Sequence, residues 1–414
     1  MGWALAVALL HPTAEATYSI VASDASSGQC GVAVQTDNLA VGASVPSAAA
    51  GVGAIASQFE TNPRHGPRGL ALLAEGKSPA EALQVLLRED GNFEGRGIEA
   101  RQIAIVSADG RTAVHTGTDA NQSDWAGARS GPGYSVQGNG LAGPQVLAAM
   151  EQAYLATPGP LAERLLAALG AGEQAGGQRT GRESAALLVR TREGFPQDID
   201  LRVDHSDDPI GQLRLIYGLQ AGRQQIIEAR LAGRRGQLGE ARKLLSAAGS
   251  RVTTWPRGCV LAAEVAVEIE QPALALQFLA QAFEKNPARI PRVLGEGGFA
   301  RLGADPQFHR WVSADLEQQA LAARRQVVAT PGVAREDRVA AAQLLLEIGH
   351  APEGLALLNP AVFRASSSDD FLLLATAHQA TGDLPAARAD CWAGLQHHPD
   401  DPRLAARLAQ LPAP

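Results

Sequence analysis

The chain has 414 residues, of which 45% are hydrophobic and 19% charged, and its formal net charge is −7. This length exceeds what one ordinary core organises, so two or three domains are expected. The composition is that of a globular protein, and the acidic balance argues against a nucleic-acid partner, which requires a basic face. Beyond residue 16, no apolar run approaches the roughly 20 residues that span a membrane.

The first 16 residues have the pattern of a signal peptide. Residues 3–10 form an apolar run, His11-Pro12 interrupts it, and Ala14-Glu15-Ala16 has the small-x-small form of a cleavage site. No Lys or Arg precedes the apolar run, so the true start of translation is left open. We expect export to the periplasm or the medium, without membrane insertion after cleavage.

Cleavage after Ala16 would give Thr17 a free α-amine. Such a threonine can act as nucleophile and base at once, because its hydroxyl attacks while its own amine accepts the proton. The ordinary pKa of that amine, roughly 7.7–8.0, suits this role near neutral pH. The alternative is a mature N-terminus without chemistry, since Ala-x-Ala is common in an alanine-rich chain.

Residues 17–218 combine strand and helix patterns. Apolar or alternating runs between turn residues predict strands at 18–22, 30–35, 51–58, 102–106, 112–116, 134–138, 184–189 and 199–203. Helical periodicity covers 67–88, 143–157 and 160–171. The dipeptide Asp109-Gly110 between two strands predicts a hairpin. Strand pairs, then helices, then strand pairs indicate an α+β domain in which helices cover the sheet faces.

After residue 218 the strand signals end and helical periodicity dominates. A short motif recurs at 236–242, 270–276, 349–355 and 382–388, with offsets of 34 residues between the first two and 33 between the last two. This period resembles the tetratricopeptide repeat. We therefore expect an all-α helical repeat domain over 221–414, with a surface for a protein partner. Because 290–335 departs from the period, a generic helical bundle is the alternative.

Other motif matches fail on their context. Gly51-x-Gly53-x-x-Ala56 lies inside a strand rather than before a helix, so it is no dinucleotide fingerprint. The sequence has no His-Glu-x-x-His, Cys-x-x-Cys or Gly-x-Ser-x-Gly motif. Its three cysteines, Cys30, Cys259 and Cys391, are far apart and give no disulfide framework. No metal and no cofactor are expected, and Thr17 has no strong rival as nucleophile.

Residues 17–218 resemble, over their full length, the bacterial and archaeal family called domain of unknown function 1028. The resemblance is carried by T-Y-S-I-V-A at 17–22, G-V-A-V-Q at 31–35, V-G-A-S-V-P at 41–46, A-G-V-G-A-I-A-S-Q at 50–58, T-N-P-R-H-G-P-R-G-L at 61–70, Y-S-V-Q-G-N at 134–139, L-A-G-P at 141–144 and S-A-A-L-L-V at 184–189. Members are placed in the N-terminal nucleophile (Ntn) hydrolase superfamily and commonly begin Met-Thr-Phe-Ser-Ile-Val-Ala.

This resemblance implies a four-layer αββα sandwich in which Thr17 is the nucleophile, freed here by signal cleavage rather than by loss of Met. It implies hydrolysis of a small amide or peptide-like C–N bond through an acyl-enzyme. His65 stands where the family often has Tyr, and Ser47 where it often has Trp. These departures could reshape a pocket, so no substrate is carried over from the family.

The expected site surrounds Thr17 and uses polar residues of the neighbouring strands and turns. The expected catalytic residues are Thr17, Asn62 and Asn139, and the expected substrate-binding residues are Ser19, Gln35, Ser57, Gln58, Arg64 and Gln137. Asp37, Asn38 and Arg68 are further candidates. For Gln35 and Asn139 the alternative is backbone capping in tight turns, and for Arg64 or Arg68 a surface charge.

Two functions follow from the sequence. The first is an exported N-terminal-threonine amidohydrolase acting on a small-molecule amide or peptide, with the helical repeats as a partner-binding surface. The second is a non-catalytic binding or scaffold protein that keeps the Ntn fold as a platform, since fold does not settle function. Whether the mature chain begins at Thr17 distinguishes them. The sequence leaves the substrate, the partner and homo-oligomerisation open.

Overall fold

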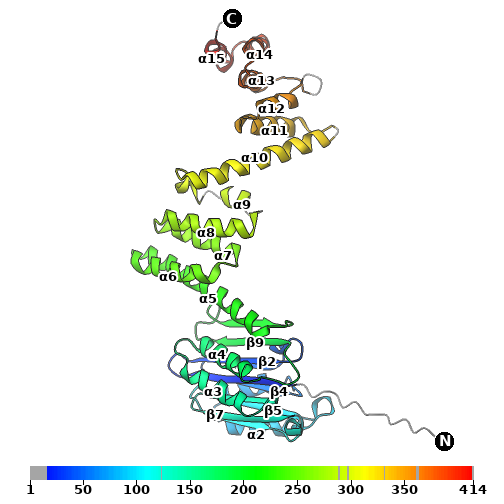
Figure 1. Cartoon of the computed structure of the whole chain (residues 1–414), viewed down its shortest axis with the longest axis vertical. Coiled ribbons are helices and arrows are strands. Elements are labelled where there is room, and N and C mark those ends of the chain that lie inside the picture. Colours follow the sequence, from blue (N-terminus) through cyan, green and yellow to red (C-terminus); the bar gives the residue numbers. More distant parts are fainter. Residues whose placement is uncertain are drawn as a thin grey trace, which may run out of the picture. The chain divides into compact units, whose positions relative to one another are not determined.

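The computed structural model describes residues 16–122, 124–287, 290–295, 298–330, 332–359 and 363–412. Apart from Ala16, the expected signal peptide lies outside the described residues. The chain divides into two compact units, Met1–Gln220 and Ala221–Pro414 (Figure 1). In the described part of the chain, no helix combines the length and apolar character needed to cross a membrane.

Two antiparallel sheets form the first unit (Figure 1). The six-stranded sheet contains β1 (Thr17–Asp24), β2 (Gln29–Thr36), β7 (Trp125–Gly131), β8 (Tyr134–Leu141), β9 (Ser184–Arg190) and β10 (Ile199–Val203). Its order is β10-β9-β2-β1-β8-β7, so β1 and β2 lie at its centre. The four-stranded sheet contains, in spatial order, β3 (Pro46–Ala49), β4 (Gly53–Phe59), β5 (Arg101–Ser107) and β6 (Thr112–Thr116).

Helices cover the outer face of each sheet. The helices α1 (His65–Ala74) and α2 (Pro79–Arg88) pack on β4 and β5 through a cluster that includes Ile55 and Leu72. The helices α3 (Gln145–Ala156) and α4 (Leu161–Gln174) pack on the six-stranded sheet through a cluster that includes Tyr18 and Leu165. A third apolar cluster joins the inner faces of the two sheets. The order of layers is therefore helices, sheet, sheet, helices.

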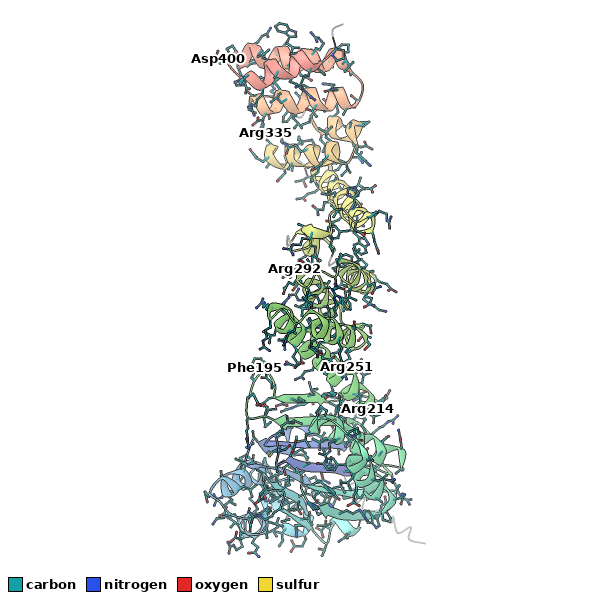
Figure 2. The ribbon with its side chains drawn as sticks, turned by 90° about the vertical axis from the view of Figure 1, so that its left-hand side faces the viewer. Phe195, Arg214, Arg251, Arg292, Arg335 and Asp400 are labelled. Carbon is teal, nitrogen blue, oxygen red and sulfur yellow. The ribbon has the colours of Figure 1, made fainter. Side chains whose placement is uncertain are left out.

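Local sequence accounts for these elements. The strands β5 and β6 pair with Val106 opposite Thr112, so the expected hairpin at Asp109-Gly110 is confirmed. Helix α2 begins with the capping box of Ser78 and Glu81. Short 3₁₀ helices lie at η1 (Val41–Ala43), η2 (Phe93–Gly95), η3 (Ile98–Ala100) and η4 (Ala120–Gln122). Between β9 and β10, the exposed Phe195 lies in a surface loop (Figure 2).

The second unit is all-helical in its described residues. Helix α5 (Pro209–Arg234) includes the boundary between the units. It is followed by α6 (Leu238–Val252), α7 (Pro256–Glu268), α8 (Pro272–Lys285), α9 (Ile290–Gly295), η6 (Ala300–Leu302), α10 (Pro306–Ala329), α11 (Arg335–Glu347), α12 (Ala351–Leu357), α13 (Ser368–Ala380), α14 (Leu384–His397) and α15 (Pro402–Gln410). The expected α+β class and the all-helical C-terminal region are thus confirmed.

The recurring motif of the sequence marks one kind of turn between helices. Gly236, Glu270, Gly349 and Gly382 all have a positive φ, between 60° and 84°. In each case the next residue donates its N–H to the carbonyl oxygen five residues back, as in the Schellman motif. Glycine suits this left-handed conformation, which explains its recurrence in the motif. The same local chemistry therefore ends α5, α7, α11 and α13.

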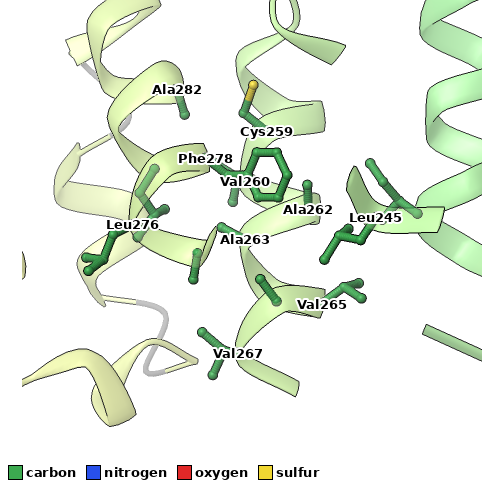
Figure 3. Packing of buried hydrophobic residues seen from close by; sticks show 14 of the residues in the cluster. Leu245, Cys259, Val260, Ala262, Ala263, Val265, Val267, Leu276, Phe278 and Ala282 are labelled. Carbon is green, nitrogen blue, oxygen red and sulfur yellow. The ribbon is translucent and has the colours of Figure 1, made fainter. Parts of the chain in front are cut away.

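Small and branched apolar side chains form the core of the second unit (Figure 3). Leu245 of α6, Val260 of α7 and Phe278 of α8 are buried together in this cluster. A second cluster, which includes Leu345 and Phe363, lies among the helices from α10 to α13. The three cysteines, Cys30 in the first unit and Cys259 and Cys391 in the second, are all free and buried.

Candidate active site

Thr17 is the first residue of β1, next to the centre of the six-stranded sheet. Its register partners are Thr36 on β2 and Asn139 on β8. Because side chains alternate along a strand, Thr17 and Ser19 face the four-stranded sheet, whereas Tyr18 faces the helices. Thr17 is only 4% exposed, so its side chain is enclosed in the structure.

The layer between the two sheets has an apolar half and a polar half. The apolar half is built from Val21, Val32, Val34, Ala54, Ala56, Ala104 and Val106, among others. The polar half contains Thr17, Ser19, Thr36, Gln58, Gln102, Gln137 and Asn139, all buried. We call the side chains of Gln58, Gln102, Gln137 and Asn139 the amide network. A buried polar layer of this kind is stable only when its groups are hydrogen-bonded.

The amide network holds the backbone of Thr17 on both sides. Asn139 Oδ1 accepts the Thr17 N–H at 3.1 Å, and Gln58 Nε2 donates to the Thr17 carbonyl oxygen at 3.2 Å. Gln102 Oε1 accepts from Asn139 Nδ2 at 2.9 Å and from Gln58 Nε2 at 2.8 Å. Gln102 thus joins the amides of Asn139 and Gln58, so the position of Thr17 is set by residues of both sheets.

Ser19 and Gln137 complete the polar half. The Ser19 hydroxyl donates to Gln58 Oε1 at 2.6 Å, and Gln137 Nε2 donates to the carbonyl oxygen of Ala56 at 3.1 Å. Gln137 Oε1 is buried without a hydrogen-bond partner. The side chains of the polar half are all neutral amides or hydroxyls. They therefore position Thr17 without offering it a titratable base.

Ala16 lies fully buried beside Thr17, and both of its backbone polar groups are bound. Its N–H donates to Asp37 Oδ1 at 3.0 Å. Its carbonyl oxygen accepts three hydrogen bonds: from the Thr36 hydroxyl at 2.8 Å, from the Asp37 N–H at 3.4 Å and from the Gln178 side-chain amide. We call these three donors the carbonyl cage.

The carbonyl cage also orients the Thr17 hydroxyl. The Oγ1 atoms of Thr17 and Thr36 are 3.0 Å apart. A hydroxyl carries one proton, and that of Thr36 is directed to the Ala16 carbonyl oxygen. Thr17 is therefore the donor between the two hydroxyls. One short chain of hydrogen bonds connects the Thr17 hydroxyl to the carbonyl oxygen of the preceding peptide bond.

Gln35 lies on the other face of the six-stranded sheet. Its Nε2 donates to Glu173 Oε2 at 2.9 Å, and the same carboxylate oxygen accepts the Tyr18 hydroxyl at 3.0 Å. Burial, together with the negative charge of Glu173, raises the pKa of Tyr18 well above its usual range. The structure thus places Gln35 in the packing of the sheet against α4, rather than with Thr17.

Ser57 and Asn62 lie on the outer side of the four-stranded sheet, next to α1. Ser57 Oγ is 3.1 Å from His65 Nδ1, and Asn62 Nδ2 donates to Asp90 Oδ1 at 3.2 Å. His65 Nε2 lies 3.1 Å from Asp90 Oδ1, but its direction makes no hydrogen bond. Burial lowers the pKa of His65 against the opposing attraction of Asp90, which favours the neutral imidazole. This Ser-His-Asp arrangement is enclosed between sheet and helix.

The two arginines expected near the substrate lie on the helical layer outside that sheet. Arg64 is exposed, and its guanidinium is 6.0 Å from the centre of the Phe93 ring. Arg68 donates to Glu89 at 2.9 Å. Asn38 accepts the N–H of Leu39 at 2.8 Å, a local turn contact. The structure therefore gathers Thr17, Ser19, Gln58, Gln137, Asn139 and Asp37, and leaves the remaining expected residues outside the site.

Three residues of the site were not expected from the sequence: Thr36, Gln102 and Gln178. Thr36 follows Val34 by two positions, so alternation along β2 could have placed it on the face of Thr17. Gln102 lies on the other sheet, and Gln178 follows α4 and reaches the site where it bridges to Leu141. Among the described residues, no group of His, Cys, Asp and Glu is arranged to hold a metal ion.

Comparisons with known proteins agree on one family. Residues 17–213 match the model of a family described as of unknown function, DUF1028. Among solved structures, the crystal structure of protein SPO2555 from Silicibacter pomeroyi, which carries the same family model, is similar. It is 34% identical, with 49% of this chain and 84% of that chain covered and a TM-score of 0.44. No curated protein matches the chain.

Proposed function

This chain belongs to the DUF1028 family through residues 17–213, and we propose that it is an exported amidohydrolase whose nucleophile is Thr17, freed by cleavage after Ala16. The observation that carries the proposal is the pairing of a fixed threonine with a carbonyl cage. The amide network holds Thr17 at both backbone groups. The cage binds the carbonyl oxygen of Ala16, and we place the carbonyl oxygen of a substrate in the same cage.

The wider fold and location belong to the same proposal. The order of layers and the place of Thr17 at the start of a central strand support an Ntn-hydrolase αββα sandwich. The recurring Schellman turns support a tetratricopeptide-like helical unit that binds a protein partner. The alanine-rich junction before Thr17 supports export to the periplasm or the medium.

The reaction would proceed in two balanced steps. The Thr17 hydroxyl attacks the carbonyl carbon of the substrate amide, and its proton passes to the Thr17 amine. The negative oxygen that forms accepts hydrogen bonds from donors fixed in advance, of which each is worth about 10²–10³ in rate. The C–N bond breaks as the ammonium returns its proton to the leaving nitrogen. Water then hydrolyses the ester on Thr17 by the same route and restores the hydroxyl.

The free amine of Thr17 is well placed for this role. In the uncleaved chain the same nitrogen donates to Asn139 Oδ1. After cleavage, one amine hydrogen keeps this bond and so fixes the direction of the lone pair that takes the proton. With an ordinary pKa of roughly 7.7–8.0, the amine would be largely deprotonated in mildly alkaline buffer.

Two experiments test the proposal. The intact mass of protein recovered from an exporting host is expected to correspond to a chain that begins at Thr17. A chain that retains Ala16 would keep the threonine nitrogen in a peptide bond and contradict the mechanism. The second experiment compares the mature wild type with Thr17→Ala on a panel of small amides, peptides and ureido compounds.

In that comparison, Thr17→Ala is expected to lose activity by several orders of magnitude, because the attacking oxygen is gone. Thr17→Ser keeps both hydroxyl and amine and should retain part of the activity. Thr118→Ala, at an exposed threonine, is the matched control and should behave as wild type. Hydrolysis by Thr17→Ala at the wild-type rate would exclude Thr17 as nucleophile and favour the scaffold role.

A further inference from the structure

We infer that the pocket occupied by Ala16 is the acyl-side binding site of the mature enzyme and that it selects a glycine or alanine residue before the scissile bond. This inference rests on the proposed function, and it names the substrate class: peptides or amides with a small aminoacyl unit. In the uncleaved chain, Ala16 itself is such a unit, and it lies fully buried where the acyl part of a substrate would be.

The backbone contacts of Ala16 define what the pocket recognises. Its N–H donates to Asp37 Oδ1, and its carbonyl oxygen is held by the carbonyl cage. A substrate of the form –NH–CHR–C(=O)–NH– offers the same N–H donor and the same carbonyl acceptor. A free aminoacyl amide can do so as well, with its ammonium group paired to the Asp37 carboxylate. A simple acyl amide without the α-nitrogen would leave this acceptor unused.

The side-chain position of the pocket is small. Ala16 is fully buried, and a methyl group built on Gly140 would overlap with the Ala16 Cβ atom. Gly140 has a φ of 60°, a conformation that residues with a side chain rarely adopt. The glycine therefore leaves room for one methyl group on its neighbour. A leucine at the position of Ala16 would need this wall to move.

In the described part of the chain, the side chain of Gln178, one of the three donors of the carbonyl cage, has no other hydrogen-bond partner to replace a bound carbonyl group. The residue is 8% exposed, and its Oε1 has no hydrogen-bond partner. Among the described residues, its amide nitrogen bonds to the Ala16 carbonyl oxygen. Once the leader is cleaved, this buried amide loses its partner. A buried unpaired amide is costly, so a substrate carbonyl that replaces Ala16 would recover the lost hydrogen bond.

The test measures binding apart from turnover. The mature chain carrying Thr17→Ala is titrated calorimetrically with three probes: N-acetyl-alaninamide, N-acetyl-leucinamide and alaninamide. We expect N-acetyl-alaninamide to bind at least tenfold more tightly than N-acetyl-leucinamide. Gln178→Met is expected to weaken the binding of N-acetyl-alaninamide at least tenfold. Gln84→Ala, at an exposed glutamine, is the control that should leave this affinity unchanged.

A second variant separates recognition from folding. Asp37→Asn keeps an oxygen acceptor but removes the charge. It should therefore weaken the binding of the cationic alaninamide at least tenfold and leave the affinity for N-acetyl-alaninamide nearly unchanged. Equal affinities for the alanine and leucine probes, no binding of any probe, or no effect of Gln178→Met would each overturn the inference.

The failure of the inference and that of the proposed function can be distinguished. If the Thr17→Ala chain binds the alanine probe selectively but the mature wild type hydrolyses no amide, the pocket assignment is supported and the amidohydrolase function is contradicted. If the mature wild type hydrolyses other amides but the alanine probe is not bound selectively, the amidohydrolase function is supported and this pocket assignment is contradicted.

Discussion

Replacement of the buried Arg101 by methionine should strongly destabilise the first unit. The Arg101 side chain is 1% exposed, and its Nε donates to Asp90 Oδ1 at 2.8 Å. The same guanidinium donates to the carbonyl oxygens of Glu60, Phe93 and Arg96 at 2.6–2.9 Å. Methionine fills similar space but supplies none of these donors.

The magnitude follows from what Arg101→Met leaves behind. The Asp90 side chain is 2% exposed, so the substitution leaves a buried carboxylate without its cationic partner. Removing one member of a buried ion pair costs about 3–5 kcal/mol. Some of the three carbonyl oxygens can accept hydrogen bonds from water instead, so we expect the total loss in unfolding free energy to stay within this range.

Hydrogen exchange of the buried amides of β5 measures this loss, because the slowest amides exchange through opening of the whole unit. The matched control is Arg68→Met, which removes a partner of Glu89 from a pair whose side chains are 41% and 51% exposed, and it should leave exchange unchanged. Adding Asp90→Asn to Arg101→Met should recover part of the loss. A change below about 1 kcal/mol in Arg101→Met would refute the reasoning.

Four further predictions concern the titration of His65 and Asp90, the packing of Leu245 and the isolated second unit. Burial lowers the pKa of His65, so the folded chain binds fewer protons at this residue than the unfolded chain does. The stability from the neutral imidazole should therefore be fully present above about pH 6.5 and should fall as the pH drops toward the lowered pKa. Urea titrations of His65→Gln at several pH values should lack this pH dependence. The Asp90 pKa is also lowered, since hydrogen bonds from Arg101 and Asn62 outweigh the opposing effect of burial, so a further loss is expected below about pH 4. Leu245→Ala empties part of a fully buried position and should cost about 2–5 kcal/mol in denaturant unfolding of the second unit. Residues 221–414 expressed alone should give an almost purely helical circular dichroism spectrum, and a substantial strand signal would contradict the position of the boundary.

The fold class could be predicted because local signals agree with the final structure. The strands at 18–22, 30–35 and 134–138 carry apolar or alternating residues between clear turns, and all three have a neighbouring strand on both sides. The strands β3 and β7 were missed because their small and polar residues lack that pattern. Both lie at the edges of their sheets, where burial does not impose strong alternation.

The site could be predicted only in part. Alternation placed Ser19 on the face of Thr17, and the hydrogen bonds through Gln58 join the two residues. The same alternation explains why Gln35 and Ser57 do not lie at the site. Each is one position away from a residue that faces the inner layer, so its side chain lies on the opposite face of its sheet. Gln102 and Gln178 come from distant segments. A single sequence contains no information on how two sheets align, so neither could be assigned to the site.

The three buried cysteines can serve as natural probes of local opening in the native chain. Burial raises the pKa of the Cys30 thiol to about 11, and it raises those of Cys259 and Cys391 as well. A protonated, enclosed thiol reacts with a maleimide or a disulfide reagent only while its surroundings are open. Cys30 lies in the first unit, and Cys259 and Cys391 lie in different helices of the second. The order in which the three are labelled therefore ranks the looseness of three regions without any introduced probe.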